Sequence, residues 1–182
     1  MHAGPPGSRR RILAFAAGAL VTAAAAPASA ALRFTDRRTL SFHHLHTGES
    51  LEATYWIDGR YQPRELERIN RLLRDFRTGE VYPIDLELLD LLLALRRRLA
   101  SRAPFQVISG YRSPATNAML ASLTEGVSSN SLHLSGQAID IRLPDRSLGM
   151  MNRAALSLQG GGVGYYPRSD FIHLDVGRVR RW

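Results

Sequence analysis

Residues 131–140 read SLHLSGQAID, and the rest of the chain is best interpreted outward from this stretch. It places His133 and Asp140 on either side of Gly136, and Asp140 enters an apolar run typical of a buried strand. Because glycine permits a tight backbone turn, both side chains can reach one point. A lone carboxylate between two isoleucines in a buried strand would cost several kcal/mol unless it were paired or bound to a metal. The stretch is therefore interpreted as half of a metal site.

The other half is expected near the end of the chain, where residues 169–176 read SDFIHLDV. Strand alternation puts His173 and Asp175 on one face of this run. With His133 and Asp140, His173 makes three ligands, the number that a catalytic zinc uses while its fourth position stays open. Two histidines and one carboxylate also describe non-haem iron sites, but the compact set and its tetrahedral number favour zinc.

A rival metal site is offered by three histidines on an earlier strand. His43, His44 and His46 lie within the expected strand 38–46, which a glycine-containing loop joins to a second strand at 51–56 as a hairpin. Clustered histidines without an acidic partner are more often residues of a strand surface, and metal ligands are usually held by a further shell of hydrogen bonds. We therefore favour surface positions for these three.

The remaining pattern predicts alternating helices and short strands. Leucine and isoleucine spacing predicts helices from Pro63 to about residue 78 and from Pro83 to about Ser101. Further helices are expected at 115–123 and 145–159, and further strands at 105–108, 137–143, 160–166 and 171–176, the last two as an antiparallel pair. The predicted fold class is α+β, with a small antiparallel sheet that carries the site and helices packed on one side.

The first 30 residues are expected to be an export signal. Three arginines at 9–11 precede an apolar, alanine-rich run at 12–26 and an Ala-Ser-Ala cleavage signal at 28–30. The arginines suit a twin-arginine signal, although they would also serve a general secretory one. An uncleaved anchor is the alternative, but the run is short for a bilayer span of roughly 20 residues. Cleavage would leave one domain at 31–182, working in the periplasm or cell envelope.

Composition narrows the function classes. The chain has 182 residues, 45% of them hydrophobic, which suits a single domain with a substantial core. Removing the three arginines of the signal from a formal net charge of +8 leaves +5, and all basic side chains are arginine. These charges are dispersed among acidic residues, so no nucleic-acid partner is expected, whereas an anionic polymer such as the bacterial cell wall fits. The lack of cysteine excludes disulfides, thiolate metal sites and a cysteine nucleophile.

Taken jointly, several motifs resemble a known family. The pattern of His133, Gly136, Ala138 and Asp140 with a later histidine resembles the zinc D-alanyl-D-alanine peptidases, which share a fold with lysostaphin and the hedgehog signalling domain. The export signal and four further motifs closely resemble the YcbK-like murein endopeptidases, of the murein endopeptidase K type. These motifs are HTGE at 46–49, SGYRS at 109–113, GVGYY at 162–166 and VGRVRRW at 176–182. The resemblance covers nearly the whole mature chain.

This resemblance implies a zinc metallopeptidase that hydrolyses peptidoglycan stem peptides. It implies one Zn²⁺ held by His133, Asp140 and His173, which would activate a water for attack on the peptide bond. Arg112 matches the family's arginine near the metal, where it would stabilise the developing oxyanion or grip a substrate carboxylate. The alternative for Arg112 is a surface ion pair.

The general base is less directly implied. Relatives place a glutamate three residues, or a histidine two residues, before the last ligand, and these positions hold Asp170 and Phe171. Because Phe171 cannot take a proton, Asp170 is the candidate, although aspartate is shorter than glutamate. Asp175 is the second choice, either as base or as the carboxylate that orients a ligand histidine. We expect a substrate groove to be lined by Tyr111, Ser128 and Ser131. Each of these could equally be a turn or packing residue.

Two other functions remain open on the residues alone. One is a DD- or LD-carboxypeptidase that trims monomeric stems instead of cutting cross-links. The other is a non-catalytic peptidoglycan-binding module of the same fold, although such a module has no need of an open metal position. The bond that is cut, a D-alanyl link or a direct diaminopimelate link, is not decided. A monomer is expected, and an adaptor is unknown.

Overall fold

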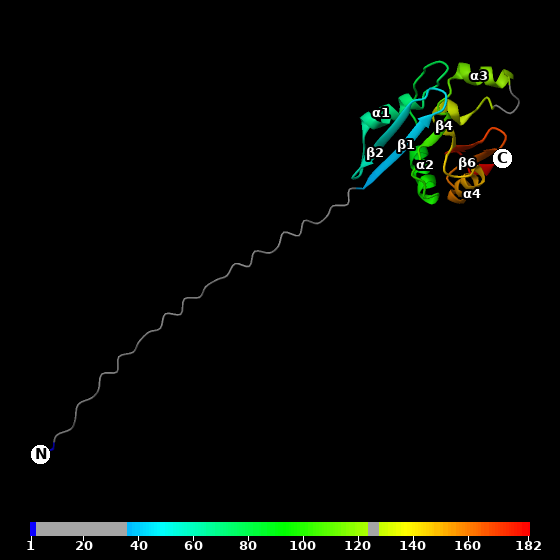
Figure 1. Cartoon of the computed structure of the whole chain (residues 1–182). Helices are drawn as coiled ribbons and strands as arrows, with labels where there is room; N and C mark the ends of the chain where they lie inside the picture. The colour runs from blue at the N-terminus through cyan, green and yellow to red at the C-terminus, as the bar shows by residue number, and fades with distance from the viewer. Residues whose placement is uncertain (3–35, 124–127) are drawn as a thin grey trace. The chain divides into compact units, whose positions relative to one another are not determined.

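The computed structural model describes residues 1–2, 36–123 and 128–182, and the last two of these ranges form one α+β unit (Figure 1). The predicted export signal and the domain boundary at residue 31 fall almost entirely on residues 3–35, outside the described ranges. Within those ranges, no helix is both long enough and apolar enough to span a membrane.

A single mixed sheet of eight strands organises the described part of the chain. Its order is β3-β2-β1-β4-β5-β7-β6-β8. The strands are β1 (Arg37–His44), β2 (Ser50–Ile57), β3 (Arg60–Tyr61), β4 (Phe105–Ser109), β5 (Ala138–Arg142), β6 (Gly162–Tyr166), β7 (Phe171–Asp175) and β8 (Arg180–Arg181). The expected hairpin is β1 and β2, and the expected antiparallel pair is β6 and β7.

The expectation of a small antiparallel sheet was imprecise in both size and direction. β1 pairs with β4 in parallel, as β6 does with β8, and the other neighbours are antiparallel. A parallel pair needs a long crossover connection, and the chain between β1 and β4 supplies one through β2, β3 and two helices. β3 and β8 each have two residues, too few for an alternation pattern to predict them.

Four α-helices and one short 3₁₀ helix complete the described part of the chain. They are α1 (Pro63–Leu72), α2 (Leu86–Arg98), α3 (Pro114–Leu123), η1 (Leu132–Ser135) and α4 (Leu148–Leu158). Asp85 and Ser147 cap α2 and α4 through side-chain hydrogen bonds, so both helices begin later than the apolar spacing indicated. Helix α1 ends earlier than expected, because Asp75 accepts hydrogen bonds from the amides of Arg77 and Thr78 and holds a loop there.

One face of the sheet packs against helices, and the other carries the candidate site. α2 contacts β1 and α4, and α4 contacts β6 and β7, so these two helices cover one face of the sheet. Ile139 of β5 and Leu174 of β7 belong to the hydrophobic core. Alternation along the strands therefore turns Asp140 and His173 to the opposite face. That face carries the candidate site.

Gly136 makes the turn that the sequence required of it. Its φ is 66°, in the left-handed region that favours glycine, and it ends η1. A Cβ at this position would lie 2.2 Å from the carbonyl oxygen of Pro83, so no side chain fits. His133 lies on η1, before β5, and the turn brings it close to Asp140.

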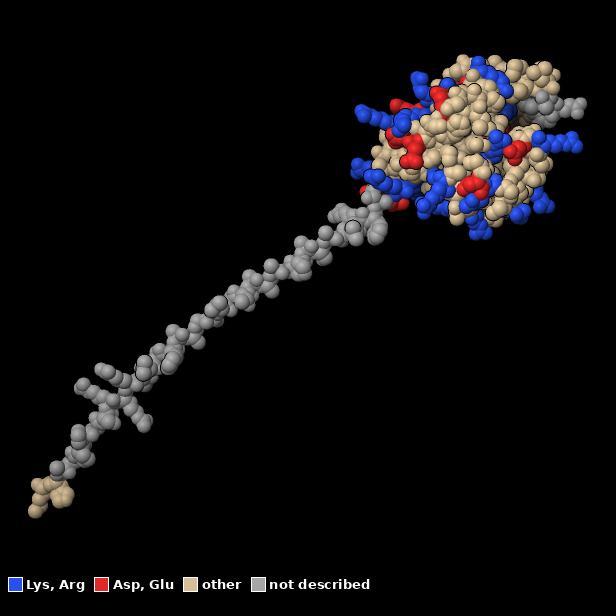
Figure 2. All heavy atoms as spheres, viewed as in Figure 1, with Lys and Arg blue, Asp and Glu red and all other residues tan. Residues whose placement is uncertain are grey.

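Charged side chains are interspersed on the molecular face seen in Figure 2. Arginines and fewer acidic residues are scattered mainly around its edge, with uncharged residues between them, and they form no continuous basic stripe. This distribution agrees with the dispersed charge of the sequence.

Candidate metal centre

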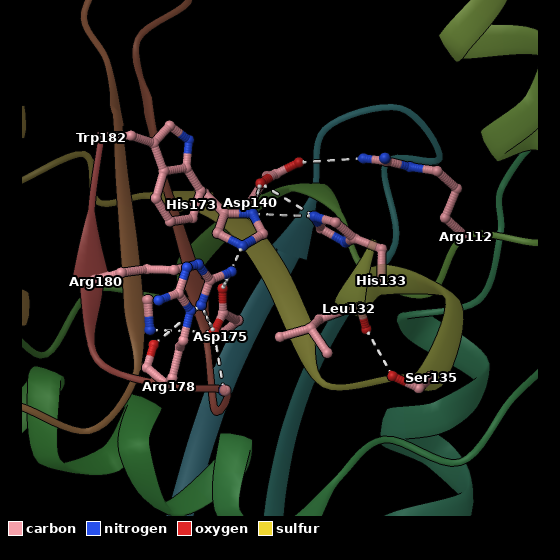
Figure 3. A network of polar contacts seen from close by, with 12 residues as sticks. Arg112, Leu132, His133, Ser135, Asp140, His173, Asp175, Arg178, Arg180 and Trp182 are labelled. Carbon is pink, nitrogen blue, oxygen red and sulfur yellow. Dashed lines mark hydrogen bonds and ion pairs between the residues drawn. The ribbon is translucent and has the colours of Figure 1, made fainter. Parts of the chain in front are cut away.

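The three expected ligands meet at one point (Figure 3). Asp140 and His173 are directly paired residues of β5 and β7, and His133 approaches from η1. His133 Nε2 lies 3.2 Å from His173 Nδ1 and 3.3 Å from Asp140 Oδ1, and the latter two atoms are 3.0 Å apart. All three side chains are buried.

These separations fit a small tetrahedral ion. Metal bonds of about 2.0–2.1 Å place neighbouring ligand atoms of a tetrahedron about 3.3 Å apart. Among the described residues, His133, Asp140 and His173 form the single group of histidine and acidic side chains whose ligand atoms converge in this way. The group borders a cleft of about 520 Å³, so an ion bound there would be accessible from the cleft.

The second ring nitrogen of each histidine is also engaged. Nδ1–H of His133 donates to the carbonyl oxygen of Gly110 at 2.7 Å, and Nε2–H of His173 donates to Asp175 Oδ2 at 3.0 Å. Such bonds fix the ring orientation and the tautomer, leaving His133 Nε2 and His173 Nδ1 free to bind a metal. This is the arrangement that metal-ligating histidines ordinarily have.

Asp175 is fully buried behind His173, and its hydrogen-bonding capacity is filled. Besides His173, it accepts hydrogen bonds from the amides of Gly162 and Gly177 and two from the guanidinium of Arg180, at 2.7–3.1 Å. Burial would raise the pKa of this carboxyl, but the bonds from His173 and Arg180 outweigh it and keep the pKa well below its usual range. The geometry suits the orienting role expected as one alternative for Asp175.

Electrostatics at the three ligands favour a cation. Burial would raise the pKa of Asp140, but His133 and His173 hold it well below its usual range. Burial would lower the pKa of His173, yet hydrogen bonds to Asp140 and Asp175 raise it to about 9. Two carboxylates thus stabilise positive charge at this point, and a divalent ion would be stabilised in the same way.

Arg112 extends over the cleft from the loop after β4. Its Nη2 lies 3.7 Å from Asp140 Oδ2, and its Nη1 donates to Asn117 Oδ1 at 3.3 Å. Its buried Nε has no hydrogen-bond partner among the described residues. Burial lowers the pKa of Arg112, and the charge of Asp140 opposes this. Arg112 is thus a largely buried arginine beside the ligands, not a solvent-exposed ion pair.

Only some of the other expected site residues line the cleft. Ser128 and Ser131 line the cleft, whereas Tyr111 is buried away from it, stacked on Tyr82. The side chain of Asp170 is 64% exposed, and its carboxylate pairs with Arg142 at 2.8 Å. The structure therefore does not bring Asp170 together with the three ligands.

The rival histidines do not converge on a common point. His44 is completely buried and His43 bonds Ser50, while His46 stacks on Phe76 with ring centroids 4.2 Å apart. The expectation of surface positions was thus wrong for His44. The end of β1 turns it inward beside Phe76, where an aromatic neighbour replaces solvent.

Several cleft residues were not expected from the sequence as site residues, and three of them lie beside His173. They are Tyr166, Arg180 and Trp182, and all lie in motifs that supported the family resemblance. An arginine and two aromatic residues near a chain end are unremarkable in a sequence. Only the pairing of β6 with β7 and β8 brings them to His173.

Two buried histidines and one buried carboxylate converge beside a cleft on the sheet of an α+β fold. This site is typical of metallohydrolases, the class of protein that it indicates. The sequence model of the family described as "Peptidoglycan L,D-endopeptidase MepK" matches residues 33–182, and the chain belongs to this peptidase family. The resemblance to murein endopeptidases is thereby confirmed.

Curated relatives agree with the family assignment. The peptidoglycan L,D-endopeptidase MepK of Escherichia coli (strain K12) is 44% identical over 177 residues, covering 96% of this chain and 97% of the relative. The protein of the same name from Shigella flexneri gives the same values. The probable peptidoglycan L,D-endopeptidase MepK of Haemophilus influenzae is 41% identical over 146 residues, covering 80% of this chain and 78% of the relative.

Proposed function

We propose that this chain is an exported, zinc-dependent endopeptidase that hydrolyses peptide cross-links of peptidoglycan in the cell envelope. The observation that carries the proposal is the convergence of His133, Asp140 and His173 within 3.3 Å of one another beneath an open cleft. The printed names of the relatives specify an L,D-endopeptidase. They support the direct diaminopimelate link as substrate over the D-alanyl link.

The ligand set supports zinc, with His133 Nε2, His173 Nδ1 and Asp140 Oδ1 as the three protein ligands. When bound, the ion would polarise the scissile carbonyl and lower the pKa of a water for nucleophilic attack. The protein supplies the rigid frame for this chemistry. Gly110 holds the ring of His133 and Asp175 holds the ring of His173, so neither ligand has to reorganise during the reaction.

Arg112 is proposed to bind developing negative charge on the substrate. Its guanidinium lines the cleft beside Asp140, and its Nη2 is 3.7 Å from the Asp140 carboxylate, too far for a hydrogen bond, so this nitrogen can donate to an incoming oxygen. A fixed cation in a partly desolvated cleft stabilises an oxyanion more strongly than a mobile one in water. The same donors could hold a substrate carboxylate.

Asp175 and Asp170 are proposed to have different roles. Asp175 lies behind His173 with its oxygens filled, so we propose that it orients His173. Asp170 can serve as general base only if its ion pair with Arg142 opens, because that pair holds the carboxylate away from the ligands. Its neighbours Ser169 and Phe171 do line the cleft, so the turn is close enough for such a movement to matter.

The test uses purified cross-linked muropeptide dimers and the full chain. Dimers should become monomers with the wild-type protein, and a chelator or His133→Ala should abolish this. His43→Ala is the matched control, because it removes a histidine of β1 that bonds Ser50 outside the metal centre. Bound zinc is measured by elemental analysis for each protein.

Other outcomes would assign another function. Trimming of monomeric stems while dimers persist would indicate a carboxypeptidase. Persistent dimers, together with retention on sacculi and one bound zinc, would indicate the binding module.

A further inference from the structure

One wall of the cleft is built from aromatic side chains that the chemistry described above does not use. Tyr166 of β6 and Trp182 line this wall beside His173. The indole of Trp182 lies 5.2 Å from the ring of His173, between centroids, and Tyr166 stacks on Phe171 at 4.6 Å. The wall therefore touches the ligand group on the side away from Arg112, as Figure 3 shows for Trp182.

A glycine makes this wall possible. Gly164 is the residue of β6 directly opposite His173 in the antiparallel ladder. A Cβ at Gly164 would lie 2.8 Å from ring carbons of both Tyr166 and Trp182. Any side chain at this position would push the two rings apart. The close approach of these two exposed rings to the strand therefore requires a glycine at this position.

Within the wall, one hydrogen bond orients the Tyr166 hydroxyl. Nε1–H of Trp182 donates to the phenolic oxygen of Tyr166 at 2.8 Å. Because the indole nitrogen can only donate, it occupies an acceptor position of the oxygen and turns the phenolic hydrogen elsewhere. That hydrogen has no acceptor among residues 36–123 and 128–182. Since Tyr166 lines the cleft, the hydroxyl is a donor available to a substrate.

We infer that Tyr166 is a substrate-contacting residue whose hydroxyl donates a hydrogen bond to an oxygen of the peptide chain, and that Trp182 is the positioning residue that aims it. The inference rests on the proposed function. It names the residue that would contact the end of the peptide farther from Arg112. A stem peptide crossing the ligands would meet Arg112 at one end and Tyr166 at the other. The acceptor is a carboxylate or carbonyl oxygen, both of which a stem peptide carries.

Three variants test the inference on the metal-loaded full chain. Tyr166→Phe keeps the stack on Phe171 and removes only the hydroxyl, so kcat/KM for dimers should fall about tenfold, the worth of one hydrogen bond of about 1.4 kcal/mol. Trp182→Phe removes the indole donor and should cost less. The double variant should lose little beyond the larger single loss, because Trp182 acts through the hydroxyl. Zinc content and thermal midpoint should stay at wild-type values in Tyr166→Phe.

The matched control is Tyr165→Phe, which removes a hydroxyl from the adjacent exposed tyrosine on the other face of β6. Dimers with free and with amidated diaminopimelate carboxyls distinguish the acceptor. A smaller effect of Tyr166→Phe on amidated dimers identifies a carboxylate, and an equal effect identifies a carbonyl.

Two results would overturn the inference, and both differ from failure of the proposed function. If the wild type cleaves dimers and Tyr166→Phe does so within about twofold of it, the hydroxyl makes no useful contact while the peptidase assignment stands. If the wild type cleaves nothing, binding of intact dimers is measured by titration. Equal affinity of wild type and Tyr166→Phe then overturns the inference, and about tenfold weaker binding of the variant supports it.

Discussion

Asp75 and Ser113 are joined by two hydrogen bonds, because Oδ2 of Asp75 accepts from both the amide and the hydroxyl of Ser113, at 2.9 and 2.6 Å. Both residues are buried outside the cleft. The Ser113 hydroxyl also accepts from the amide of Thr116 at the start of α3, and Asn117 on the same helix contacts Arg112. The pair thereby fixes the loop and the helix between which Arg112 is held.

Asp75→Asn should lower activity without removing the metal. Burial alone would raise the pKa of Asp75, but donors from Ser113 and Thr116 outweigh it and keep the pKa well below its usual range. An amide NH₂ facing these donors would break at least one bond, which costs about 1.5–3 kcal/mol for a charged acceptor. We expect kcat/KM for dimers to fall at least about tenfold. Zinc content, measured in parallel, should stay at one ion, and its loss would instead assign Asp75 to the fold of the ligand group.

Asp175→Asn should weaken zinc binding. The amide keeps the shape of the side chain but loses the charge that holds His173 and Arg180. Partners of ligand histidines commonly contribute about 10–100-fold to metal affinity, and we expect a loss in this range by competition with a chromogenic chelator. Arg153→Gln, an exposed substitution on α4, is the control. Unchanged affinity together with a large fall in kcat would show that Asp175 acts on the substrate and not on the ligand.

Asp170→Asn examines the general-base assignment. Because the Asp170 carboxylate is exposed and paired with Arg142, we expect kcat to change by less than about threefold, as for other surface pairs. Arg142→Gln, which frees the same carboxylate, is the companion variant. A fall in kcat near hundredfold for Asp170→Asn, with zinc retained, would show that the pair opens on substrate binding and that Asp170 takes the proton.

Acid sensitivity of the fold should depend on His44. Burial, reinforced by the positive charges of His46 and Arg74 and opposed by Glu49, lowers the pKa of His44 from 6.5 to about 4. Between these values the unfolded chain binds a proton that the folded chain does not, so the free energy of unfolding falls as pH decreases through this window. The full effect is roughly 3 kcal/mol.

Urea unfolding in the presence of a chelator measures this dependence without a contribution from metal release. His44→Gln should flatten the decrease in unfolding free energy between about pH 6.5 and pH 4 relative to the wild type. His43→Gln, on the outward side of the same strand, is the matched variant. Parallel pH profiles for wild type and His44→Gln would contradict the prediction.

Local sequence patterns were sufficient to identify residues that converge, because two of the three expected ligands lie in short strands and the third, His133, precedes a glycine turn. Asp140 and His173 are paired in neighbouring strands, and the glycine that turns the chain toward them is visible in the sequence. The same patterns could not reveal that Arg180 reaches Asp175, since this depends on a strand of two residues.

Tertiary contacts decided the remaining differences. The apolar spacing beyond Leu72 continues as far as Phe76, but the buried carboxylate of Asp75 draws the backbone amides into a loop. The parallel pairing of β1 with β4 likewise depends on a crossover through α1 and α2, which no local alternation specifies. Asp170 follows the family spacing by position, but its partner Arg142 lies on a different strand.

The turn at Gly136 ties the metal centre to the beginning of α2. Its carbonyl accepts from the amide of Asp85, and the Asp85 side chain accepts from Gln137 while it caps the helix. Helix docking and the placement of His133 are therefore thermodynamically linked, so ion binding at the site must also strengthen the attachment of α2. His133 and the longest described helix of the core therefore hold their positions as one unit.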